Sequence, residues 1–177
     1  YGTLEDLKRL IHEAKKRDIG LMFDMVFNHT STHHEWFKKA MAGDPYYKDF
    51  YFFKKGKDHQ PPTNWESKFG GNAWEYVEAF DEYYLHLFDV TQADLNWENP
   101  NVRKEMAKIV NYWLELGVTG FRFDVINLIS KESFEDDFTG VGKRFYTDCK
   151  KVNDYLRELN EHSFGRCQHT MTVGEMS

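Results

Sequence analysis

The stretch Gly120-Phe121-Arg122-Phe123-Asp124 is a short apolar run that ends in a carboxylate, and Thr170-Met171-Thr172-Val173-Gly174-Glu175 repeats this pattern. Such runs, separated by helical segments, predict successive parallel strands of an α/β fold. In a (β/α)8 barrel, the C-terminal ends of the strands face the substrate. Because neighbouring strands lie about 4.8 Å apart, the two carboxylates would sit roughly 5 Å from each other, the separation that retaining glycoside hydrolysis needs.

The segments around these strands fit the same fold. Residues 2–17 carry apolar positions at helical spacing, and residues 19–27 form the nearly continuous apolar run of a strand buried on both faces. Asn99 and Pro100 predict the start of a helix that Gly117 ends. The fold class is therefore α/β, and the chain is predicted to be part of a (β/α)8 TIM barrel.

Residues 30–97 differ from the rest in composition. They hold Pro61-Pro62, Gly70-Gly71, many aromatic residues and short alternating pieces. A stretch of this length is too long for a plain connection between strand and helix, so it predicts an inserted subdomain. We expect two units: a partial barrel made of residues 1–29 and 98–177, and an insert made of residues 30–97. A polar loop is predicted from 130 to 147, followed by a helix from 148 to 162.

Composition excludes several classes of function. The formal net charge of −6 argues against a nucleic-acid partner, and no apolar run approaches the roughly 18 residues of a membrane span. Cys149 and Cys167 lack metal-ligand spacing and are too few for a disulfide scaffold, which favours free thiols in a reducing cytoplasm. We expect no cofactor. A complete barrel needs about 250 residues, so the 177-residue chain is predicted to be a fragment that is inactive by itself.

Arg122 and Asp124 are the first candidates for chemistry. Strand alternation places both on one face, with Phe121 and Phe123 on the other. A guanidinium beside a buried carboxylate is expected to keep it ionised, as a glycosyl nucleophile must be. The alternative, a structural ion pair in the barrel core, is left open by this segment alone.

Glu175 ends the next predicted strand without a basic neighbour in sequence. Partial burial is expected to raise its pKa, so that it acts first as a general acid and then as a base. A lone Glu after a strand is more often a residue of the barrel rim, and its pairing with Asp124 favours catalysis. Asp24, Asn28 and His29 end the earlier strand, where Asp24 could orient Arg122 and His29 could donate to a sugar hydroxyl.

Four ordered motifs resemble those of the α-amylase superfamily of glycoside hydrolases. They are Asp24-Met25-Val26-Phe27-Asn28-His29, Gln92-Ala93-Asp94-Leu95-Asn96, Gly120-Phe121-Arg122-Phe123-Asp124 and Gly174-Glu175. The resemblance implies that the chain covers about barrel strands three to five, with the family's domain B inserted after strand three. It implies that the family's third catalytic aspartate lies outside this sequence. Some relatives bind a structural calcium, and the residues of this sequence do not by themselves support such a site.

The resemblance also implies roles for single residues. Asp124 corresponds to the nucleophile, Glu175 to the acid/base and Arg122 to the partner of the nucleophile. His29 corresponds to a glucose-binding residue, and Asn28 beside it is assigned to substrate binding as well.

Two further segments resemble a narrower group. Asp124-Val125-Ile126-Asn127-Leu128-Ile129-Ser130-Lys131 is similar to the oligo-1,6-glucosidase group, and Tyr84-Leu85-His86-Leu87-Phe88 with Arg144-Phe145-Tyr146-Thr147-Asp148 is similar to the trehalose-6-phosphate hydrolase family. This implies a small sugar phosphate as substrate. Lys143 and Arg144 would then bind its phosphate, unless they are a solvated basic pair.

Two rival functions remain. One is hydrolysis of neutral isomaltose-type oligosaccharides by the same machinery. The other is a non-catalytic amylase-like partner of a membrane transporter, a class that typically lacks the catalytic carboxylates. The presence of Asp124, Glu175 and Arg122 favours an enzyme. The sequence does not determine the oligomeric state.

Overall fold

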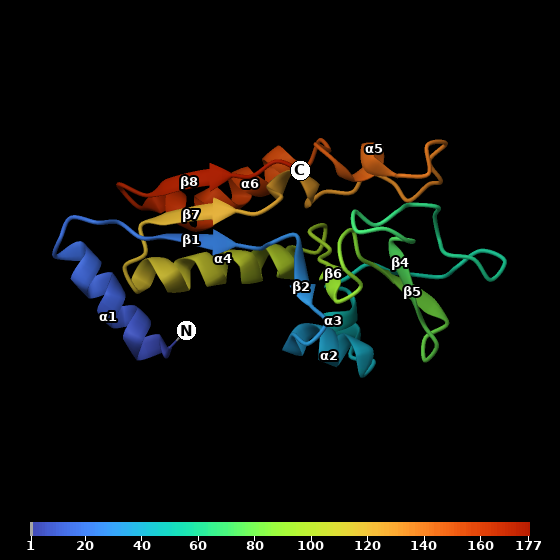
Figure 1. Ribbon diagram of the computed structural model, residues 1–177, viewed down its shortest axis with the longest axis horizontal. Coiled ribbons are helices and arrows are strands. Elements are labelled where there is room, and N and C mark those ends of the chain that lie inside the picture. The colour runs from blue at the N-terminus through green and yellow to red at the C-terminus, as the bar shows by residue number, and fades with distance from the viewer. Residues whose placement is uncertain (1) are drawn as a thin grey trace.

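The computed structural model describes residues 2–177 and contains one parallel and two antiparallel sheets with helices around them (Figure 1). The helices are α1 (Leu4–Lys15), α2 (Glu35–Met41), α3 (Pro45–Lys48), α4 (Pro100–Glu115), α5 (Lys143–Tyr146) and α6 (Val152–His162), with 3-10 turns η1 (Ile126–Leu128) and η2 (Phe164–Arg166). The strands are β1 (Met22–Met25), β2 (His29–Ser31), β3 (Phe53–Lys54), β4 (Trp74–Val77), β5 (Glu82–Leu85), β6 (Gln92–Asp94), β7 (Gly120–Phe123) and β8 (Met171–Gly174).

The parallel sheet has the strand order β1-β7-β8, so the two strands that carry the predicted catalytic carboxylates are neighbours. The register pairs Asp24 with Arg122 and Phe123 with Gly174. The chain returns through α4 between β1 and β7, and through α6 between β7 and β8. Since all three strands point the same way, their C-terminal ends meet at one edge of the sheet, as the sequence predicts.

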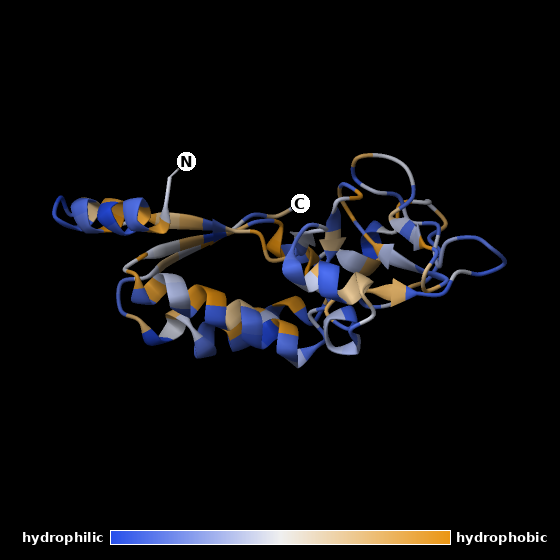
Figure 2. Cartoon of the chain, turned by 90° about the horizontal axis from the view of Figure 1, so that it is seen from below, coloured by the Kyte–Doolittle hydropathy of each residue, from blue (hydrophilic) through white to orange (hydrophobic). Residues whose placement is uncertain are grey.

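One face of this sheet packs on helices. Phe121 is fully buried, the Phe23 ring meets the Trp113 ring of α4 edge-on at 5.0 Å between centroids, and the Phe123 ring lies 5.9 Å from that of Phe164. Figure 2 shows that the helices beside the strands carry apolar residues on one side and charged residues on the other. The opposite face of the sheet is open and carries Arg122 at its centre. The predicted alternation of Phe and Arg is therefore confirmed.

The predicted helices also form, with ends set by local chemistry. Asn99 caps α4 by accepting a hydrogen bond from the backbone N–H of Asn101, and Pro100 occupies the first turn. Gly117 has φ of +100°, a backbone conformation that stops the helix. None of the helices within residues 2–177 combines the length and apolarity needed to cross a bilayer.

The segment between β1 and α4 folds into two small sheets at the far end of the molecule from α1 (Figure 1). Strands β2 and β6 pair antiparallel, so the segment leaves the parallel sheet and returns to it at the same place. A second sheet has the order β3-β5-β4, and Trp65 stacks on Phe145 at 5.9 Å between ring centroids. The division of the chain at residues 30 and 97 stays a prediction.

The segment from 130 to 147 is more ordered than the predicted polar loop. It contains α5, and Ser130, Lys131 and Asp137 are buried. Asp137 is buried because its carboxylate accepts hydrogen bonds from Thr139 and from the backbone N–H of Gly142. The polar composition of residues 130–147 therefore does not make this segment exposed, because its buried polar groups form hydrogen bonds with one another.

Candidate active site

Arg122 joins three carboxylates at the C-terminal edge of the parallel sheet. Its Nη1 donates to both carboxylate oxygens of Asp24, each at 2.7 Å, and lies 2.9 Å from Oδ1 of Asp124. Its Nη2 lies 2.5 Å from Oε2 of Glu175. The expected role of Asp24 in orienting Arg122 is confirmed. One positive charge faces three acidic groups, so the cluster favours uptake of a proton.

Protonation of the carboxyl pair differs from the sequence-based expectation. Burial, followed by the hydrogen bond with Glu175, raises the pKa of Asp124 against the opposing effect of Arg122. The pKa of Glu175 lies below its ordinary value, because of its hydrogen bond with Asp124 and the nearby charge of Arg122. The expected rise in the pKa of Glu175 is wrong, and the pKa of Asp124 is raised although Arg122 lies beside it, for two geometric reasons. Arg122 divides its charge among three carboxylates, and Glu175 follows a strand whose residues are all exposed.

The backbone after Asp124 is strained. Val125 has φ of 40° and ψ of 40°, a left-handed conformation that is unusual for a β-branched residue and costs about 1–3 kcal/mol. The turn is held because the N–H of Ile126 donates to the carbonyl oxygen of Glu175 at 3.1 Å. The N–H of Glu175 donates in turn to the carbonyl oxygen of Phe123 at 2.9 Å. These bonds fix the two candidate catalytic residues relative to each other.

A fully buried ionic network lies behind the end of β1. The side chains of Lys131 and Asp94 have no exposed surface, and the Lys131 ammonium lies 2.8 Å from Oδ2 of Asp94. The same ammonium donates to Oδ1 of Asn28 at 3.1 Å and to the carbonyl oxygen of Leu128 at 2.7 Å. Nδ2 of Asn28 donates to Oδ2 of Asp94 at 3.1 Å. Asn28, predicted to bind substrate, is thus a buried link in this network.

Sequence reasoning assigned no role to Asp94 or Lys131. Lys131 lies in the predicted polar loop from 130 to 147. The available signal for Asp94 was its place inside the motif Gln92–Asn96. The two residues are 37 positions apart, and only the meeting of β6 with the segment after β7 brings them together.

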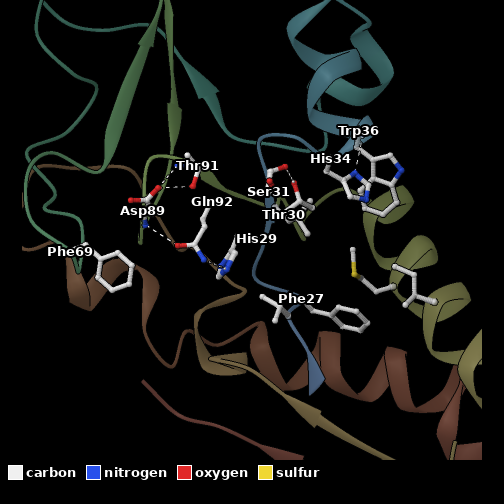
Figure 3. Close-up of a pocket in the computed structure, with 14 residues that line it drawn as sticks. Phe27, His29, Thr30, Ser31, His34, Trp36, Phe69, Asp89, Thr91 and Gln92 are labelled. Atoms are coloured by element: carbon white, nitrogen blue, oxygen red, sulfur yellow. Dashed lines mark hydrogen bonds between the residues drawn. The ribbon is translucent and has the colours of Figure 1, made fainter. Parts of the chain in front are cut away.

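His29 lies next to this network and is mostly buried. Its Nδ1 is 3.3 Å from Nδ2 of Asn28, and its Nε2 is 3.1 Å from Nε2 of Gln92. Oε1 of Gln92 accepts from the backbone N–H of Asp89, which fixes the orientation of that amide (Figure 3). Both ring nitrogens therefore face amide N–H groups, and the neutral ring can accept from one of them, whereas the imidazolium ion could accept from neither. Desolvation also lowers the pKa of His29, so the ring is neutral at pH 7.

A pocket of about 720 Å³ opens beside His29 (Figure 3). Its lining includes Ser31, Trp36, Phe69 and Gln92, but neither Asp124 nor Glu175. The pocket is therefore adjacent to the carboxyl cluster and separate from it. Trp36 also packs edge-on against Phe50, as a core ring does.

The two predicted phosphate-binding residues have different surroundings. Nε of Arg144 lies 3.3 Å from Oδ1 of Asp137, and its guanidinium packs over the Phe145 ring at 4.5 Å. Arg144 is thus neutralised and held. Lys143 is exposed and has no carboxylate within ion-pair distance among residues 2–177. Within the same described range, no three His, Cys, Asp or Glu side chains are grouped as a metal site.

Comparison with known proteins places this geometry in a family context. A family model described as the catalytic domain of alpha amylase matches residues 1–177. The trehalose-6-phosphate hydrolase of Bacillus subtilis (strain 168) is 55% identical over 180 residues, which are 100% of this chain and 32% of that protein. The oligo-1,6-glucosidase of Parageobacillus thermoglucosidasius is 44% identical over 183 residues, covering 99% of this chain and 32% of that protein.

A solved structure agrees equally well. The crystal structure of Bacillus licheniformis trehalose-6-phosphate hydrolase superposes with a TM-score of 0.97 and 54% sequence identity. The match covers 100% of this chain and 32% of the other. The chain therefore spans about a third of the length of the relatives it matches.

Proposed function

The chain belongs to the alpha-amylase catalytic domain family and is a fragment of its TIM barrel, and on this basis we propose that it carries the catalytic centre of a retaining α-glucosidase. The proposed reaction is hydrolysis of trehalose 6-phosphate to glucose and glucose 6-phosphate. The observation that carries the proposal is the contact of one guanidinium, that of Arg122, with the carboxylates at the ends of two adjacent strands.

Asp124 and Glu175 are proposed as the catalytic pair. One guanidinium contacts both, with Nη1 of Arg122 2.9 Å from Asp124 and Nη2 2.5 Å from Glu175, which holds the two carboxyl groups close together, as retaining enzymes require, rather than at the roughly 6.5–9.5 Å of inverting enzymes. This supports the retaining route. Asp124 attacks the anomeric carbon while Glu175 donates a proton to the leaving oxygen, and Glu175 then removes a proton from the water that releases glucose.

Glu175 must carry a proton and Asp124 must be an anion when the attack begins. A sugar ring bound over the carboxyl groups takes water away from Glu175, which favours its protonated form. Asp124 keeps its contact with Arg122, which favours its anion. Substrate entry thus prepares both groups for their roles.

His29 and Asn28 are proposed to serve the glucose that is cleaved. Neutral His29 can exchange its contact with Gln92 for a sugar hydroxyl. Asn28 is proposed to act indirectly, by holding His29 in place, because its amide group is bound to Asp94 and Lys131. On the other side of the cleaved bond, Lys143 is the free candidate for the phosphate, whereas Arg144 serves to hold its own loop through Asp137.

The substrate is supported by relatives rather than by geometry. The names of the relatives include trehalose-6-phosphate hydrolase at 55% identity and oligo-1,6-glucosidase at 44% identity. The test uses the full-length protein that contains this chain. Its rates of hydrolysis of trehalose 6-phosphate and of isomaltose are measured in parallel. Preference for the phosphorylated sugar supports the proposal, and preference for isomaltose assigns the same machinery to an oligo-1,6-glucosidase. Hydrolysis of neither sugar would refute both readings.

Matched variants connect the activity to the site. Asp124→Asn and Glu175→Gln keep side-chain shape and remove the charge, and the loss of the acid/base is expected to cost roughly 10²–10⁴-fold in kcat.

We also propose a cytoplasmic location, because both cysteines are free thiols in the structure, Cys149 buried and Cys167 exposed. The proposed partner is the sugar phosphate alone.

A further inference from the structure

Lys68 is an exposed residue of the inserted segment that lies close to the candidate active site. Its ammonium lies 5.7 Å from the centre of the Phe88 ring, and that ring is 5.3 Å from the ring of His29. The ammonium also donates to Oγ of Ser177 at 2.5 Å, two residues beyond Glu175. A single aromatic ring therefore separates Lys68 from the proposed glucose-binding histidine.

The backbone of Lys68 is held firmly in this position. Its N–H donates to the carbonyl oxygen of Leu87 at 2.8 Å, and the hydroxyl of the preceding Ser67 donates to the carbonyl oxygen of Phe88 at 2.5 Å. The N–H of Leu87 in turn donates to Oδ1 of the buried Asp94 at 2.9 Å. Lys68 is thus connected by hydrogen bonds to the network that also holds the end of β1.

The loop of Lys68 is joined to the loop of Lys143. Nδ2 of Asn64 donates to the carbonyl oxygen of Asp137 at 2.7 Å, and Nε1 of Trp65 donates to the carbonyl oxygen of Glu135 at 2.8 Å. Gly142, directly before Lys143, packs so closely on the Trp65 ring that a Cβ there would overlap it. These contacts hold the loop that carries Lys68 against the loop that carries Lys143.

The two ammonium groups lack anionic partners of their own. Within residues 2–177 neither Lys68 nor Lys143 has a carboxylate at ion-pair distance, although the chain carries an excess of acidic residues. Desolvation, and after it the charge of Lys143, lowers the pKa of Lys68. Two cations on joined loops without a counter-charge attract an anion, and a phosphate monoester near pH 7 carries about −1.5 to −2 charges.

We propose that Lys68 and Lys143 together form the subsite for the phosphate group of a sugar-phosphate substrate, and that Lys68 determines specificity for the phosphorylated sugar. This inference rests on the function proposed above. The ligand is a dianionic sugar 6-phosphate whose glucosyl part occupies the site of Asp124 and His29. Arg144 does not contribute, because Asp137 already neutralises it.

The test is Lys68→Met in the full-length protein that contains this chain. It compares kcat/KM for trehalose 6-phosphate with kcat/KM for the uncharged p-nitrophenyl α-glucoside. We expect kcat/KM for the phosphorylated sugar to fall by about 10- to 100-fold, mainly through KM, because a charge-assisted hydrogen bond is lost. Turnover of the uncharged substrate should change by less than about threefold, which also shows that the variant is folded.

Two controls sharpen the result. Lys104→Met removes an exposed charge of α4 and should leave the ratio of the two kcat/KM values unchanged. Lys68→Arg keeps the charge and should restore a large part of the preference. Inorganic phosphate should inhibit hydrolysis of the uncharged substrate in the wild type, and its inhibition constant should rise by a similar factor in Lys68→Met.

Failure of this inference and failure of the proposed function look different. If the wild type prefers the phosphorylated sugar and Lys68→Met keeps that preference, the function stands and the assignment of Lys68 is overturned. If the wild type shows no preference for the phosphorylated sugar, the proposed substrate is wrong. Loss of both activities in Lys68→Met, with Lys68→Arg equally inactive, would make Lys68 a structural residue and refute the subsite.

Discussion

Lys131→Met tests the buried ionic network directly. The substitution removes the cation and keeps a side chain of similar length, so Asp94 retains its charge without its ionic partner in a site with no exposed surface. It also leaves Oδ1 of Asn28 and the carbonyl oxygen of Leu128 without their donor. Breaking a buried pair by removing one partner costs about 3–5 kcal/mol, so we expect a decrease of this size in the free energy of unfolding.

The assay is urea unfolding of the full-length protein followed by tryptophan fluorescence. Trp97 is a suitable reporter, since it is fully buried and its Nε1 donates to the carbonyl oxygen of Phe27 beside the network. The control is Lys151→Met, which removes an exposed ion pair with Glu98 and should cost less than about 1 kcal/mol.

A double variant measures the interaction itself. Asp94→Asn combined with Lys131→Met should be less destabilised than the sum of the single changes, with a coupling of about 0.5–3 kcal/mol. A loss no larger than that of Lys151→Met, or the absence of any coupling in the double variant, would refute the reasoning.

Four further outcomes are expected. Gly142→Ala should lower the unfolding free energy by about 1–3 kcal/mol in the same urea assay, because Gly142 has φ of +78° and the added methyl group would overlap Trp65. The pKa of His29 is lowered in the folded state, so the free energy of unfolding should fall as the pH drops below about 6.5. His29→Gln should make this free energy depend less on pH, which urea unfolding at a series of pH values measures. Asp24→Asn weakens the support of Arg122 and should lower kcat roughly 10- to 100-fold with little effect on stability, which steady-state kinetics and a melting curve check together. The isolated 177-residue chain should show no hydrolysis of p-nitrophenyl α-glucoside, and measurable turnover would contradict this.

Local sequence was sufficient for the parts of the site that follow strand geometry. Alternation along Gly120–Asp124 places Arg122 and Asp124 on the open face and the phenylalanines against the helices, and the structure confirms this arrangement. The position of Glu175 after the next strand brings it to the same edge. Helix ends were equally local, as the capped start of α4 shows.

Tertiary structure decided what surrounds these residues. The directions in which the pKa values of Asp124 and Glu175 shift could not be read from sequence, because they depend on how Arg122 distributes its charge and on the exposure of the strand before Glu175. Lys131 was unpredictable for a similar reason: its partner Asn28 is 103 positions away, and neither segment alone indicates burial.

The same limit applies to the proposed phosphate subsite, where Lys68 and Lys143 come from separate loops joined by the contacts of Asn64 and Trp65. The period of a strand or helix is a property of neighbouring residues, and sequence alone therefore determined which face of the sheet carries Arg122 and Asp124. Burial, charge sharing and proton affinity depend on which distant segments meet, and in this protein only the fold determines that.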